Sequence, residues 1–141
     1  MPPCKPDDIA SIGGNLVLQN PSTAASGNIM KGANRFVHNL GIGNTFVGEN
    51  AGNFTLTGQN NSAFGVNALL NLSSGLNNTA SGVNALYSNT SGNNNTATGV
   101  FSLINNTTGI QNTGLGVNTL FFNTDGYSNT AVGLNALTLN V

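Results

Sequence analysis

Hydrophobic and polar residues recur along this chain with a period of 17 residues, beginning at Asn44. Each unit opens with Asn followed by Thr or Ser, and repeat positions are numbered from that Asn. Position one is occupied by Asn44, Asn61, Asn78, Asn95, Asn112 and Asn129. Position five is occupied by Gly48, Gly65, Gly82, Gly99, Gly116 and Gly133. Six units in register without an insertion indicate a repeat architecture.

Three more columns run in phase with these two. Position six holds Glu49, Val66, Val83, Val100, Val117 and Leu134. Position nine holds Gly52, Leu69, Leu86, Leu103, Leu120 and Leu137. A second glycine column at position fifteen holds Gly58, Gly75, Gly92, Gly109 and Gly126. The consensus is therefore N-T-A-x-G-V-N-A-L-x-x-N-T-S/T-G-x-x.

The length of the unit predicts an all-β fold, a β-solenoid with one unit per coil, because helical-pair repeats need about 33 residues or more. The Asn-Thr-Ala-x-Gly segment alternates like a short strand, and Val-Asn-Ala-Leu is expected to form a second one. The Asn-Thr-Ser/Thr-Gly segment has the residues of a turn. Coils stack about 4.8 Å apart, so six of them should form a rod roughly 29 Å long.

Stacking would align like residues in ladders along the rod. Asn amides can hydrogen-bond to one another along such an axis and satisfy backbone groups in the turns. The Gly columns are expected where the backbone bends sharply or approaches another strand closely. The predicted role of the Asn, Gly, Val and Leu columns is therefore structural.

The chain divides into three predicted regions. Residues 44–141 form the solenoid of six repeats, the last one incomplete, and residues 1–11 form a flexible arm. Residues 12–43 are atypical capping or connecting strands, with short strands expected over 27–32 and 35–40 in a degenerate coil. Ends of solenoids are usually atypical because they cover an open edge, and charged residues protect such edges.

Charge is scarce: three basic and four acidic residues, against 27 Asn and 19 Gly. All of these charges except Asp125 lie within the first 49 residues. Without a basic stripe the chain has no electrostatic basis for binding nucleic acid. No apolar run is long enough to span a membrane, and the first residues lack the apolar region of a secretory signal.

Catalytic and metal-binding chemistry is not indicated. The chain has one His and one Cys, whereas zinc sites need several such ligands. His38 has no Ser, Cys or acid partner nearby in sequence, and a charged or capping role is expected. We therefore predict no enzymatic activity, no cofactor and no metal. Cys4 lies in the predicted arm, either as an intermolecular disulfide in an oxidising compartment or as a free thiol.

Larger apolar residues at positions ten and eleven leave one question open. They are Phe54, Leu70, Tyr87, Ile104, Phe121 and Phe122. If they face outward they form a long apolar stripe, which a soluble monomer rarely leaves exposed. Copies of the chain lying side by side would bury it. If they face inward they enlarge a thin core.

Units such as residues 78–86 and 129–137 resemble repeats of bacterial surface proteins and phage fibre proteins. They are also similar to the head repeats of trimeric autotransporter adhesins, although this repeat is longer. The resemblance covers about residues 44–141. It implies a left-handed parallel β-roll, a homotrimer of side-by-side or intertwined chains, and an extracellular or cell-surface location. Fold transfers between such proteins better than function does.

Three functions remain as hypotheses. The leading one is the structural subunit of an extracellular fibre, self-assembling as trimers that stack end to end, with Cys4 closing the joint. The alternative is an adhesin head or phage-type receptor-binding module with a host or cell-surface ligand. The third is ice binding by the Thr column at position two, whose neighbouring column at position four is irregular. The sequence leaves open whether the chain is a whole subunit or part of a longer fibre.

Overall fold

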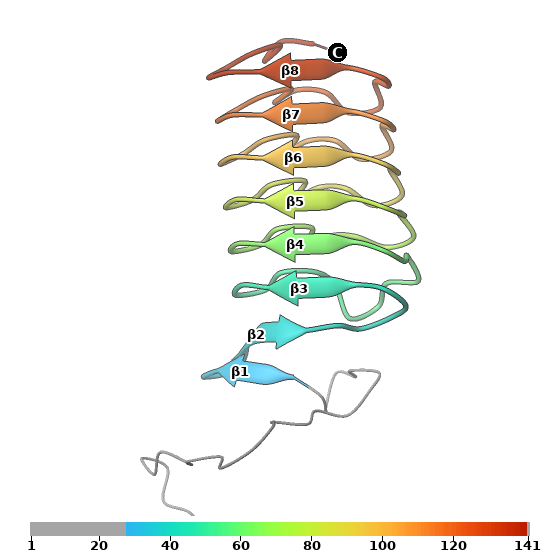
Figure 1. Ribbon diagram of the computed structural model, residues 1–141, viewed down its shortest axis with the longest axis vertical. Coiled ribbons are helices and arrows are strands. Elements are labelled where there is room, and N and C mark those ends of the chain that lie inside the picture. Colours follow the sequence, from blue (N-terminus) through green and yellow to red (C-terminus); the bar gives the residue numbers. More distant parts are fainter. Residues whose placement is uncertain (1–27, 141) are drawn as a thin grey trace, which may run out of the picture.

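The computed structural model describes residues 28–140. Within them eight strands form one sheet in sequence order, wound as a β-solenoid (Figure 1). The predicted all-β solenoid with 17-residue coils is thereby confirmed. We call the units beginning at Asn44, Asn61, Asn78, Asn95, Asn112 and Asn129 coils 1 to 6.

Each coil contributes one short strand, at repeat positions two to four. The strands of the coils are β3 (Thr45–Val47), β4 (Ser62–Phe64), β5 (Thr79–Ser81), β6 (Thr96–Thr98), β7 (Thr113–Leu115) and β8 (Thr130–Val132). They pair in parallel and in register, so that Thr79 lies beside Thr96 and Ala80 beside Ala97. Like residues therefore stack along the rod, as the sequence period predicts.

The second strand expected at positions six to nine is wrong, because that segment is a turn in coils 2 to 6 and contains no strand in coil 1. In coil 3 the backbone is left-handed at Asn84, with φ of 57°, and at Leu86, with φ of 50°. Asn tolerates this conformation, whereas Leu adopts it at a cost of about 1–2 kcal/mol. Leu86 is fully buried, and burial of a Leu side chain contributes about 1.5–3 kcal/mol. Burial therefore outweighs the local preference of the backbone.

The core is thin and consists of small residues at positions three and eight with Leu at position nine. Its fully buried members in coils 2 to 5 include Ala63, Ala80, Ala97, Ala68, Ala85, Leu69, Leu86, Leu103 and Leu120. Coil 1 fills the same space differently, with Phe46 at position three and Gly52 at position nine. A Cβ on Gly52 would lie 2.6 Å from the Phe46 ring. A large residue at one position thus requires the smallest at the other.

The N-terminal end is closed by a β-hairpin of β1 (Ile29–Lys31) and β2 (Asn34–His38). These strands lie close to the two that the sequence predicts, but the degenerate coil is wrong. The tight turn at Gly32 and Ala33, where Gly32 has φ of 62°, reverses the chain after only two residues. As a result β2 pairs with β3 in antiparallel fashion instead of completing a parallel coil.

The glycine columns lie where neighbouring coils approach most closely. A Cβ on Gly82, whose φ is 145°, would lie 2.4 Å from the Gly99 carbonyl oxygen of the next coil. In the second column, a Cβ on Gly92 would lie 2.4 Å from the Gly109 carbonyl oxygen. Neither space admits a side chain, so the stacking distance itself requires both glycine columns.

Candidate assembly surfaces

The Asn column at position one forms a continuous buried ladder. The side-chain oxygen of Asn78 accepts hydrogen bonds from the Asn95 backbone N–H at 3.0 Å and from its amide at 3.1 Å. The Asn95 amide also donates to the Gly109 carbonyl of its own coil at 2.7 Å. Each Asn thus ties its coil to the one before it and closes its own turn. The column is part of the scaffold rather than a binding site.

A second internal amide ladder runs along position twelve. Asn106 donates to Asn89 at 3.3 Å, and Asn123 donates to Asn106 at 2.9 Å. All three are fully buried. Sequence reasoning placed this Asn in a turn and missed its inward direction. The recurrence of Asn at position twelve in coils 3 to 6 could have indicated this inward direction, because a turn that faces solvent accepts several residue types.

The C-terminal end of the solenoid leaves its core columns uncovered in the described chain. Leu137 is 48% exposed, whereas its counterpart Leu120, one coil earlier, is fully buried. A Cβ on Gly133 would meet no atom within 4 Å, in contrast to the other glycines of its column. The next coil that would cover these groups is absent from residues 28–140. Within residues 28–140, β8 therefore has one unpaired edge, and the core of coil 6 is uncovered on that side.

The N-terminal end is covered by aromatic packing around His38. The His38 ring lies between Phe46 and Phe54, at centroid distances of 4.8 and 4.5 Å. Its Nε2–H donates to the Ala51 carbonyl at 2.8 Å, and the Arg35 guanidinium lies 4.1 Å from the centre of the Phe54 ring. His38 has the capping role that was one of the two expected for it.

The surroundings of His38 keep it uncharged. Burial lowers the pKa of His38, the hydrogen bond to Ala51 opposes this, and the nearby charge of Arg35 lowers the pKa further. Its Nδ1 is buried and has no hydrogen-bond partner within the described part of the chain. The buried ring enclosed by two Phe side chains packs the cap, and its lowered pKa favours the neutral form over the charged role considered from the sequence.

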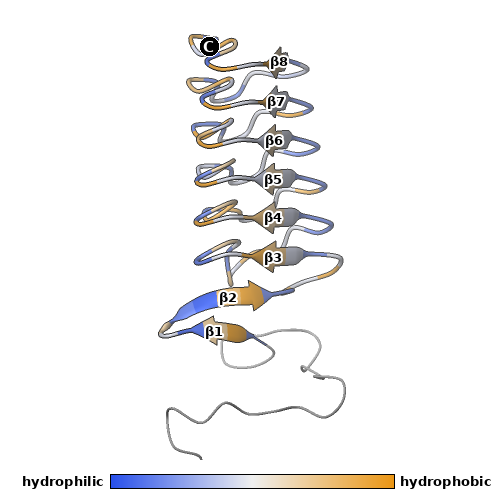
Figure 2. Cartoon of the chain, turned by 60° about the vertical axis from the view of Figure 1, so that its left-hand side comes forward, coloured by the Kyte–Doolittle hydropathy of each residue, from blue (hydrophilic) through white to orange (hydrophobic). Residues whose placement is uncertain are grey.

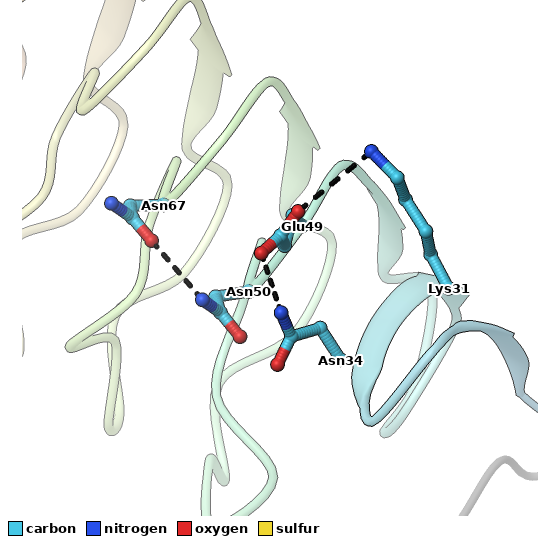
Figure 3. Close-up of polar contacts among 5 residues, drawn as sticks. All are labelled: Lys31, Asn34, Glu49, Asn50 and Asn67. Atoms are coloured by element: carbon cyan, nitrogen blue, oxygen red, sulfur yellow. Dashed lines mark hydrogen bonds and ion pairs between the residues drawn. The ribbon is translucent and has the colours of Figure 1, made fainter.

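A small polar cluster joins the hairpin to coil 1 (Figure 3). Glu49 accepts a hydrogen bond from Asn34 and lies 3.9 Å from the Lys31 ammonium. Next to it the Asn50 amide donates to Asn67 of coil 2 at 3.5 Å. Glu49 occupies position six, where later coils have Val or Leu. The one charge in that column is therefore used to hold the cap.

The outer face of the strands carries an apolar strip that sequence reasoning missed. Strand residues alternate between the two faces, so the buried Ala at position three requires positions two and four to face outward, and the exposure of position six places it at the surface as well. Val66, Val83, Val100 and Val117 are between 37% and 41% exposed. We call the following residues the lateral strip: Phe64, Val66, Val83, Val100, Leu115, Val117, Val132 and Leu134.

Positions ten and eleven answer the question left open by the sequence. Phe54, Leu70, Tyr87, Ile104 and Phe121 are half-buried at the surface, and Phe122 is exposed. None of them belongs to the fully buried core. They neither fill the interior nor form a fully exposed stripe.

The described residues contain no group of three or more His, Cys, Asp and Glu side chains that would hold a metal ion. A hollow of about 670 Å³ is lined by residues 39–45, none of which is ionisable. No helix of the described part is long and apolar enough to cross a membrane. Cys4, the proposed disulfide residue, lies outside the described residues.

The chemistry of the described surfaces is thus that of strand edges, amides and apolar side chains. Comparisons of the chain with protein-family models, curated proteins and solved structures gave no match.

Proposed function

We propose that the protein is the structural subunit of an extracellular fibre or surface appendage, which assembles from side-by-side trimers stacked end to end. The left-handed winding, the threefold symmetry and the extracellular location belong to this proposal and follow from the resemblance of the repeats. The observation that supports self-assembly best is the lateral strip, where exposed apolar side chains recur in every coil from coil 2 to coil 6.

The direction of the terminal strands favours stacking of one subunit on the next. β1 is antiparallel to β2, and β2 is antiparallel to β3, so β1 runs in the same direction as β3 to β8 (Figure 1). The edge of β8 that is unpaired within residues 28–140 can therefore pair in parallel with the corresponding edge of β1 in another copy. Such a head-to-tail contact repeats without closing, which generates a filament.

The side chains at the two ends suit such a joint. β1 presents Ile29 and Met30, both exposed, and the open coil presents Leu137 and Leu139. In coils 2 to 6 the only ionised side chain is Asp125, so like-charge repulsion between stacked subunits is small. Apolar burial together with strand pairing would stabilise the contact.

The test is negative-stain electron microscopy of the purified chain and of two variants at Thr130. In the inner coils the N–H at position two donates to the next coil, as from Thr113 to the Asn129 carbonyl at 2.8 Å. Thr130 has no next coil in the described chain, so Thr130→Pro removes a donor only at the joint. We expect filaments from the parent and from Thr130→Ala, and short rods from Thr130→Pro.

Treatment with reductant distinguishes a disulfide contact from strand pairing at the joint. Loss of filaments on reduction would assign Cys4 to the contact, and their persistence would leave strand pairing as its basis. Discrete particles from the parent at every concentration would rule out the fibre function.

The alternative is an adhesive head or receptor-binding module for a host or cell-surface ligand. What favours it is the variation at position sixteen, which is Leu76, Asn93, Ile110 and Tyr127 in coils 2 to 5. Leu76, Ile110 and Tyr127 are exposed, so a regular scaffold displays changing side chains there. Binding of the purified chain to a glycan array, lost on Tyr127→Ala, would support this function over the fibre.

A further inference from the structure

We infer that the lateral strip is the surface through which copies of this chain lie side by side, parallel and with their coils level. The inference rests on the proposed function and specifies the contact behind its side-by-side association. The strip runs along coils 2 to 6 and consists of the outward residues at positions four and six.

The strip has at least one apolar side chain in each coil from 2 to 6, while position four is Ser81 in coil 3 and Thr98 in coil 4. The Val residues at position six are a little more than one third exposed, Phe64 and Leu115 are nearly half exposed, and Val132 and Leu134 of coil 6 are 64% and 72% exposed. Figure 2 shows the hydrophobic colour recurring at the same place in successive coils, beside the ends of the strands. A contiguous exposed apolar patch of this kind marks an interaction surface in soluble proteins.

The repeat period indicates which partner fits. Apolar side chains of the strip recur once per coil, about 4.8 Å apart along the rod. Only a surface with the same axial period places an apolar group opposite each of them over five coils. A second copy of this chain has the same axial period because it has the same sequence. The strip of one copy therefore fits the strip of another.

Charge favours a parallel and level arrangement. Glu49 occupies position six in coil 1 and ends the strip at the N-terminal side, where it is held by Lys31 and Asn34. In an antiparallel pair, Glu49 of one copy would lie against the apolar coil 6 of the other and lose its contact with water, which is costly for a carboxylate. With level parallel copies, the Glu49 side chains lie opposite one another at the end of the strip, and Lys31 of each copy offsets their charge.

The first test introduces one carboxylate into the strip and one into a different face. Val100→Glu places at position six the residue that coil 1 already has there, and Thr108→Glu places an acid at position fourteen, where coil 5 already has Asp125. Both changes therefore suit the coil. We expect the parent to sediment as a multimer of side-by-side copies and Thr108→Glu to match it. Val100→Glu should raise the concentration for half-assembly at least tenfold, with an unchanged circular dichroism melting curve at concentrations below the assembly of the parent.

The second test reports the arrangement directly. In a Cys4→Ser background, Val83→Cys and Val117→Cys place thiols two coils apart on the strip, and Thr90→Cys places one on an exposed turn. Level parallel copies predict disulfide-linked dimers from each strip variant alone and none from Thr90→Cys. A mixture of the two strip variants should give no mixed disulfide. A dominant mixed product would overturn the level parallel arrangement.

The outcomes separate the inference from the function beneath it. The inference is overturned if the multimer persists in the Val100→Glu variant. It is also overturned if the parent has only one chain across the width of its rods at every concentration, even if end-to-end filaments form. A multimer dispersed by Val100→Glu supports the inference even if the parent never forms filaments, in which case only the fibre function fails.

Discussion

The two ends of the described solenoid differ in how the core of the terminal coil is covered. At the N-terminal end, β2 and the His38 side chain cover coil 1, and its position nine is Gly52 because the Phe46 ring of the same coil fills the space. At the C-terminal end of the described residues, Leu137 keeps the standard repeat residue and is half exposed. Coil 1 thus has a sequence adapted to its cap, whereas coil 6 keeps the sequence of an inner coil.

The difference shows that burial of the core residues of one coil depends on the coil stacked next to it. Leu120 and Leu137 have the same left-handed backbone, with φ of 49° and 50°, and hence the same local cost. Leu120 is fully buried because coil 6 lies on it, whereas Leu137 has no such neighbour in the described chain. Stability in a solenoid is therefore a sum over contacts between neighbouring coils, and inner and terminal substitutions should differ in effect.

The largest effect is expected from Gly82→Val, compared with Gly133→Val in the last coil. At Gly82 the new Cβ would lie 2.4 Å from backbone, and at Gly133 it would meet nothing within 4 Å. Overpacking and backbone strain each cost about 1–3 kcal/mol, and only strain applies at Gly133. We expect Gly82→Val to lower the free energy of unfolding by about 3 kcal/mol or more, clearly beyond Gly133→Val, in urea denaturation followed by circular dichroism.

Equal losses from these two variants would show that the close contact between position-five glycines does not limit stacking. Gly82→Ala serves as the control, because it adds the Cβ alone and should already account for most of the loss.

A smaller effect is expected from Asn95→Ala, compared with Asn129→Ala. Asn95 accepts from the buried Asn112 backbone N–H at 3.0 Å, and removal of that acceptor leaves the donor unsatisfied. Such a loss costs about 1–3 kcal/mol. Asn129 is only partly buried and is the last described rung of the ladder. We expect about 2–3 kcal/mol at Asn95 and about 1 kcal/mol at Asn129.

The same pair of variants sharpens the proposed assembly. If a further subunit stacks on coil 6, the Asn129→Ala loss should grow with protein concentration, since Asn129 then becomes an inner rung. A loss independent of concentration would indicate that coil 6 stays uncovered under those conditions.

Much of the scaffold could be predicted from the sequence because the repeat makes each position visible five or six times. The 17-residue coil and the strand at positions two to four follow from periodicity and alternation alone. The turn at positions six to nine could not be predicted in this way. Its left-handed Leu contradicts local preference, and only the burial of Leu69, Leu86, Leu103 and Leu120 in the assembled rod explains it.

The candidate surfaces were predicted less completely. The lateral strip follows from the same alternation once Ala at position three is known to face inward, but the sequence pattern alone assigned the Val column to the scaffold. The hairpin cap depends on one turn at Gly32 and Ala33, which occurs once and has no repetition to reveal it. A feature that occurs once, at an end of the described solenoid, has no repetition in the sequence to reveal it.

The smallest effect is a pH dependence confined to the capped end. Because burial lowers the pKa of His38, the unfolded chain binds its proton at a higher pH than the folded chain does. The stability due to neutral His38 is therefore complete above about pH 6.5 and declines as pH falls below it, by at most about 1.4 kcal/mol per pH unit. His38 is the only His in the chain, so the C-terminal coils lack a group that titrates in this range. We expect amide signals of β2 and β3 to broaden between pH 7.5 and 5.5 in nuclear magnetic resonance spectra, while those of β6 stay unchanged.

His38→Phe keeps the ring between Phe46 and Phe54 without a titrating group, and its spectra should not change with pH. A response of equal size at β6 would show that the cap and the inner coils unfold as one unit, contrary to the independence of the two ends.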